Sequence, residues 1–101
     1  MMIDVVRMFL EDCPVRVEAI RAAIADADAA RIRATAHTLK GAAAYLAAGF
    51  VVDAAASLEM MGLEGRVAEA AAGIERLDAA VAQLIPELGS WLNRVETDER
   101  P

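Results

Sequence analysis

Apolar residues recur at helical spacing along nearly the whole chain, and this repeat restricts the chain to an all-α fold. The clearest example is Ile32, Ala36, Leu39, Ala43 and Leu46, which share one face of a helix because they stand three or four residues apart. No segment has a convincing strand pattern. Alanine supplies roughly a quarter of the residues and aromatic residues only 4%, so we expect helices that pack closely through small side chains.

Five helical segments are expected from this spacing. They cover approximately residues 3–11, 14–25, 29–47, 51–62 and 66–93. Asp12 is a capping residue and Pro14 suits the first turn of a helix, so the first two segments are predicted to be separate helices. Asp26 and Asp28 mark the boundary before the third segment. Pro86 lies inside the fifth segment and is expected to kink or break it.

The connections between these segments are short, which favours antiparallel neighbours. The expected fold is therefore an antiparallel up-and-down four-helix bundle with a short extra N-terminal helix. A chain of 101 residues is long enough to bury one core and suits a single domain. We assign residues 1–95 to the bundle and the polar residues 96–101 to a frayed tail.

Composition and charge exclude several classes of function. The formal net charge of −6 leaves no basic stripe for nucleic-acid phosphates. No apolar run is long enough to span a membrane, and the N-terminus lacks a signal-peptide pattern. Cys13 is the only cysteine and His37 the only histidine, so neither an intrachain disulfide nor a His/Cys metal cluster is expected. No Gly-rich phosphate loop is present. We expect a cytoplasmic monomer without metal, cofactor or independent catalytic activity.

The only histidine stands in an unusual sequence context. With the core face of the third segment as reference, a rotation of 100° per residue puts His37 about 140–160° away, on the solvent side. Arg33, Lys40 and Gly41 lie one turn from it. An exposed imidazole has a substantial neutral fraction near neutral pH and can act as a nucleophile. A phosphoryl group on the ring would be negatively charged, and Lys40 and Arg33 are placed to offset that charge.

Gly41 supports the same interpretation. A glycine inside a helix costs roughly 1 kcal/mol relative to alanine, in a chain that uses alanine at most comparable positions. The missing methyl group clears space beside His37 for a phosphoryl group and for the surface that delivers it. Taken singly, a surface histidine, a solvated lysine and a glycine at a packing contact are ordinary features. Their combination indicates a phosphoacceptor site.

The run Ala36-His37-Thr38-Leu39-Lys40-Gly41 resembles the signature of histidine-containing phosphotransfer (HPt) domains, in which an alanine and the phosphorylated histidine precede x-Leu-Lys-Gly. The resemblance extends over most of the chain. Residues 8–14 resemble the family's first helix and its exit, the Asp26 region resembles the turn before the histidine helix, and residues 58–62 resemble the end of the next helix. One position departs from the family, because Ala47 stands where a further glycine is usual.

This resemblance implies a role for each site residue. His37 would accept the phosphoryl group on the ring nitrogen farther from the backbone. Lys40 would steady the phosphoryl group, and Gly41 would leave room for it. Glu59 occupies the place of a Gln or Glu on the following helix that hydrogen-bonds the other ring nitrogen, which would fix the tautomer and raise the basicity of the imidazole.

The resemblance also implies the partners and the kind of function. The chain would be a phosphoryl carrier, not an enzyme, in the phosphorelay of a two-component system. It would exchange the phosphoryl group with aspartates of response-regulator receiver domains or of a hybrid histidine kinase, and catalysis and Mg²⁺ would belong to the receiver. Exposed apolar residues of the first two segments would bind the partner, with Met8 and Val15 as candidates.

Three other functions remain open at this point. A bundle of this fold that is not phosphorylated would use the surface around His37 only to bind a partner protein. The dimerisation and phosphoacceptor domain of a sensor kinase would have an acidic residue directly after the histidine and a proline a few positions on, where this chain has Thr38 and Ala42. The phosphoacceptor domain of a chemotaxis-type kinase shares His-Thr-Leu-Lys-Gly and the later glutamate. It is normally one module of a long kinase, and we expect a freestanding shuttle instead.

Overall fold

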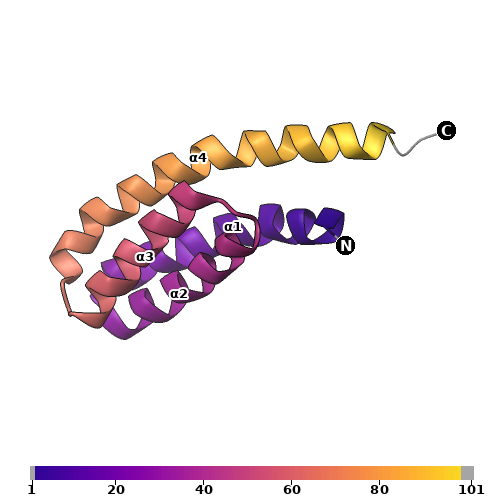
Figure 1. Ribbon diagram of the computed structural model, residues 1–101. Helices are drawn as coiled ribbons and strands as arrows, with labels where there is room; N and C mark the ends of the chain where they lie inside the picture. The colour runs from indigo at the N-terminus through magenta and orange to yellow at the C-terminus, as the bar shows by residue number, and fades with distance from the viewer. Residues whose placement is uncertain (1, 99–101) are drawn as a thin grey trace.

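The computed structural model describes residues 2–98, which form four α-helices and no strand (Figure 1). The helices are α1 (Met2–Ala25), α2 (Ala29–Tyr45), α3 (Gly49–Leu63) and α4 (Val67–Asp98). The prediction of an all-α fold is confirmed. Each helix packs against two others, since α2 contacts α1 and α3, and α4 contacts α3 and α1. Figure 1 shows the chain reversing its direction at each of the three short connections.

The prediction of a separate short helix at the N-terminus is wrong. A single helix, α1, runs through Asp12 and Pro14 without interruption. Proline lacks the amide hydrogen that would bond the carbonyl of Leu10, but Pro14 is exposed, so its ring disturbs no packing. The buried residues of α1 form one stripe on both sides of it, and they are Val6, Phe9, Cys13, Val17, Ile20 and Ala23. Burial of this continuous stripe outweighs the loss of one hydrogen bond.

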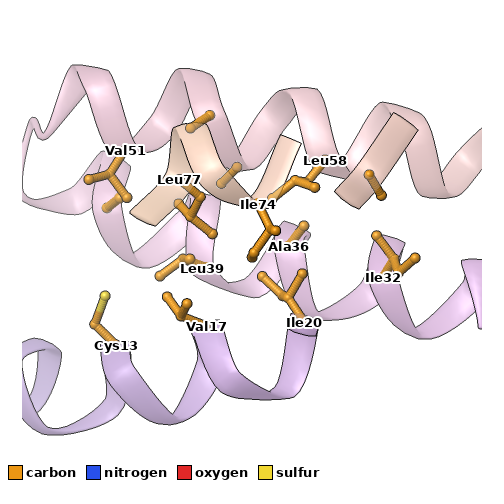
Figure 2. Packing of buried hydrophobic residues seen from close by; sticks show 14 of the residues in the cluster. Cys13, Val17, Ile20, Ile32, Ala36, Leu39, Val51, Leu58, Ile74 and Leu77 are labelled. Carbon is orange, nitrogen blue, oxygen red and sulfur yellow. The ribbon is translucent and has the colours of Figure 1, made fainter. Parts of the chain in front are cut away.

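Apart from Phe9, the core consists of aliphatic and small side chains, and all four helices contribute to it (Figure 2). Ile20, Ile32, Leu39, Leu58 and Leu77 are its largest fully buried members. As predicted, the buried face of α2 is made by Ile32, Ala36, Leu39 and Ala43, with Leu46 half-buried at its end. Burial raises the pKa of the Cys13 thiol to about 11, so this side chain stays protonated and packs as a small apolar group.

The connections between helices depend on two local features, a side-chain cap and residues with a left-handed backbone conformation. The carboxylate of Asp28 accepts a hydrogen bond of 3.1 Å from the backbone N–H of Arg31 and caps the start of α2. Past the C-terminal ends of α1, α2 and α3, the backbone takes a left-handed conformation at Ala27, Ala47 and Gly65, with φ of 53°, 56° and 71°. Glycine adopts this conformation without strain, whereas an alanine in the same conformation is strained.

The last helix is longer than predicted. α4 passes through Pro86 without a break and extends to Asp98, so the first part of the predicted tail, 96–101, is helical. Residues 99–101 lie outside the described residues, and the division of the chain at residue 95 stays a prediction. Between residues 2 and 98, no helix combines the length and the apolar character that crossing a membrane requires.

Candidate functional site

His37 lies on the solvent side of α2. Its side chain is 65% exposed, while Ala36 and Leu39 on the same helix are completely buried. The orientation follows from the helical repeat, because the apolar residues of α2 turn toward the core and His37 then points away from it. Glu59 reaches the same place from α3. It follows Leu58, which is buried in the core, and it therefore stands about 100° further around α3.

One carboxylate, that of Glu59, contacts both the candidate phosphoacceptor His37 and Lys40 on α2. Oε2 of Glu59 lies 2.7 Å from Nδ1 of His37, and Oε1 of the same group lies 2.5 Å from Nζ of Lys40. The Glu59 side chain is only 18% exposed and that of Lys40 is 32% exposed. The contact joins α2 to α3 at the surface, and it orients the imidazole and the ammonium group with respect to each other.

The contacts of Glu59 determine its own ionisation and the tautomer of His37. The hydrogen bond from Lys40 lowers the pKa of Glu59, and the hydrogen bond from His37 lowers it further, while partial burial opposes both. Glu59 is therefore an ionised carboxylate at neutral pH. Because a carboxylate can only accept, Nδ1 of His37 carries the hydrogen and donates it. In the neutral imidazole, Nε2 then keeps its lone pair and points away from Glu59.

The helix surface next to His37 is open. A Cβ atom placed on Gly41 would meet no described heavy atom within 4 Å. Beside Gly41, a groove of about 350 Å³ lies between α1 and α2, and its lining is mostly apolar. Met8 and Tyr45 belong to this lining and are 60% and 68% exposed. Val15 is also exposed, at 69%, but does not line the groove.

Tyr45 was not identified from the sequence as a residue of the surface next to His37. The available signal was its position, because it follows Gly41 by four residues and His37 by eight, which places all three on one side of α2. It is also one of only a few aromatic residues in the chain.

Arg33 is not part of the cluster that Glu59 organises. It stands one turn before His37 on α2, is exposed, and forms no ion pair with any residue between 2 and 98. Lys40 is thus the cation that the structure brings to His37. Over the same range, no group of three or more His, Cys, Asp or Glu side chains is arranged to hold a metal ion.

Comparisons with known proteins agree with this geometry. The family model described as "Hpt domain" matches residues 4–87, which is more than half of the chain and includes α2, α3 and the cluster around His37. Neither a curated protein nor a solved structure gave a match.

Proposed function

This chain belongs to the Hpt-domain family, and from that premise we propose that it carries a phosphoryl group on His37 between receiver-domain aspartates of a two-component phosphorelay. At the level of the family, Hpt domains perform histidine phosphotransfer in two-component systems and are phosphocarrier modules, not enzymes. The observation that supports the proposal is the Glu59 carboxylate, which contacts His37 and Lys40 together.

The contacts of His37 suit nucleophilic attack through Nε2. The lone pair of Nε2 forms the N–P bond while the bond between phosphorus and the aspartyl oxygen of the receiver breaks, and the aspartate leaves as a carboxylate. The ring becomes positively charged because Nδ1 keeps its hydrogen. Glu59 lies 2.7 Å from Nδ1 and offsets this charge, which stabilises the transition state more than the neutral ground state.

Lys40 supplies a positive charge for the phosphoryl group itself. In the unphosphorylated protein its ammonium group rests on Oε1 of Glu59. A phosphoryl group on Nε2 brings two negative charges within reach of this flexible side chain. Lys40 then bonds the phosphoryl oxygens, and its pairing with Glu59 beforehand keeps it next to His37 at little cost in entropy.

The surface around His37 suits a protein partner. Gly41 removes a side chain beside the imidazole, so a receiver domain, alone or as part of a hybrid histidine kinase, can bring its aspartyl phosphate close to α2. Met8 and Tyr45, on the groove next to Gly41, and Val15 offer exposed apolar area for that partner. Mg²⁺ and the groups that catalyse the transfer belong to the receiver, and the exchange takes place in the cytoplasm.

The proposal is tested by incubating the chain with a receiver domain phosphorylated on aspartate with radioactive phosphate. We expect label on this chain that is stable in base and lost in acid, as for a phosphohistidine. His37→Gln should abolish the label and leave the far-ultraviolet circular dichroism unchanged, because the side chain is exposed. Label that survives in this variant would contradict the assignment of the acceptor. No label from any receiver would favour an interaction module that is not phosphorylated.

Two further variants form a matched pair, because each removes one positive charge from α2. Lys40→Gln should slow the transfer by about tenfold, as expected for one charge-assisted contact to the phosphoryl group. Arg33→Gln should change the rate much less, since Arg33 has no part in the contact with Glu59. Equal effects of the two would show that the charge of the helix matters and the position of Lys40 does not.

A further inference from the structure

The two ends of α4 are packed differently. The fully buried residues of this helix stop at Leu77, and the larger apolar side chains from Val81 to Val95 are only half-buried. α4 has 32 residues and α2 has 17, so the two helices are about 48 and 25 Å long. Figure 1 shows the C-terminal end of α4 extending past α2 and α3, with the N-terminal part of α1 as its neighbour.

This half of α4 presents a wider apolar stripe than α1 covers. Its members recur at heptad spacing and are Val81, Leu84, Ile85, Leu88, Trp91, Leu92 and Val95. Together they occupy about 120° of the helix surface. An ion pair between Arg7 and Glu96 ties α1 to one flank of the stripe. Glu87 precedes Glu96 by nine residues, or two and a half turns, and so lies on the opposite flank.

A groove runs along that opposite flank. It has a volume of about 560 Å³ and lies between α4 and the start of α3. Phe50, Leu84, Leu88 and Trp91 line it with apolar surface, and Phe50 is 71% exposed. An exposed aromatic ring beside a half-buried tryptophan is typical of a surface that another protein covers.

The charged residues next to the groove would be complementary between two copies of the chain. Glu87 and Arg94 are both exposed, and neither forms an ion pair with another residue of the described chain. They are seven residues apart, so they share one flank of α4. A second α4 placed antiparallel, about an axis between residues 90 and 91, brings Glu87 opposite Arg94 of the second copy, and the reverse pair forms by symmetry.

We propose that the C-terminal half of α4 is a homodimerisation surface, on which a second copy of this chain packs its own α4 antiparallel. Trp91 lies beside the symmetry axis and contacts its equivalent, and the apolar side chains on either side of it close the groove. The Glu87 and Arg94 pairs set the register. The surface is separate from His37, so the dimer has two phosphoacceptor sites free. A monomer was expected from the sequence, and the half-buried state of this stripe is apparent only in the fold.

The first test is the mass of the full chain in solution, measured by sedimentation equilibrium. We expect a single chain of 10.7 kDa at low concentration and a mass that approaches twice this value as the concentration rises. Most of the proposed interface comes from half a helix of each copy, so micromolar or weaker affinity is expected. The fluorescence of the single tryptophan, Trp91, should change over the same concentrations. A chain that is still a monomer at about 1 mM would overturn the proposal.

Charge reversal tests the surface itself. Glu87→Arg creates two like-charged pairs across the axis and should weaken the dimer by about tenfold. Arg94→Glu should weaken it by a similar factor. The double variant restores both pairs with their signs exchanged and should dimerise like the wild type. Glu87 and Arg94 are both exposed at the surface, so the circular dichroism of all three variants should be unchanged.

Glu75→Arg is the matched control for the first of these variants. Glu75 is exposed on α4 and has no ion-pair partner within residues 2–98, but it lies away from the flank of Glu87. The substitution changes the net charge by the same amount and should leave the dimer unaffected. A dimer that Glu87→Arg and Arg94→Glu leave intact, or that the double variant does not restore, would place the interface elsewhere. None of these results depends on whether His37 is phosphorylated.

Discussion

Two glycines on facing helices show how differently the surfaces of this bundle are used. A Cβ atom on Gly62 of α3 would lie 2.6 Å from the backbone nitrogen of Arg33 and 2.8 Å from the carbonyl oxygen of Ala29. A Cβ atom on Gly41 of α2 would meet no described heavy atom within 4 Å. Each glycine costs its helix roughly 1 kcal/mol relative to alanine. The packing of α2 on α3 explains the first, whereas the fold gives no reason for the second.

The Gly62 contact also supports the candidate site. Glu59 and Gly62 are three residues apart, so they lie on the same side of α3, facing α2. The close approach of the two backbones at Gly62 therefore brings the carboxylate of Glu59 within hydrogen-bonding distance of His37 and Lys40. The close packing of α2 and α3 at Gly62 thus positions Glu59, which acts on the exposed surface around His37.

Gly62→Ala should have the largest effect. The added methyl group must displace backbone atoms of α2, which do not move as easily as a flexible side chain, and we expect a loss of about 2 kcal/mol in the free energy of unfolding. Urea denaturation measures it. The shift of α3 should also slow phosphoryl transfer to His37, because it lengthens the contact with Glu59. Unchanged stability would mean that α2 and α3 approach less closely than the structure has them.

Gly41→Ala is the matched substitution on the open surface, and its effect on stability should have the opposite sign. With free space for the methyl group, the better helix propensity of alanine should raise the free energy of unfolding by about 1 kcal/mol. Transfer from a phosphorylated receiver should become slower, because the methyl group stands where the partner approaches His37. If the rate matched that of the wild type, steric access would no longer explain the glycine.

Ala47→Gly should have the smallest effect. Ala47 has a φ of 56°, a conformation in which the side chain of alanine is strained and glycine is not. Part of the gain is offset because glycine gives the unfolded chain more freedom, so the variant should be more stable by about 0.5 kcal/mol in the same denaturation experiment. Its transfer rate should be unchanged, which separates a glycine needed for backbone conformation from one needed for access. A loss of stability would contradict the strain.

The sequence by itself determined the helical class, the buried face of α2, the exposed position of His37, the family, and the Lys40 and Gly41 neighbours. These features depend on residues within one or two turns of each other, so helical periodicity reveals them. Local signals failed at Pro14 and Pro86. Both prolines suggest a break in a helix, but α1 and α4 continue through them, because packing on other helices compensates for one lost hydrogen bond.

Only the tertiary structure decided how residues from different helices meet. It brought Glu59 onto Lys40 as well as His37, made Gly62 a point of close backbone approach, and left the apolar stripe in the C-terminal half of α4 only half-buried. Such contacts join residues far apart in the chain. Their distances depend on the rotation and offset of whole helices, which are set by the packing of the common core and not by any one segment.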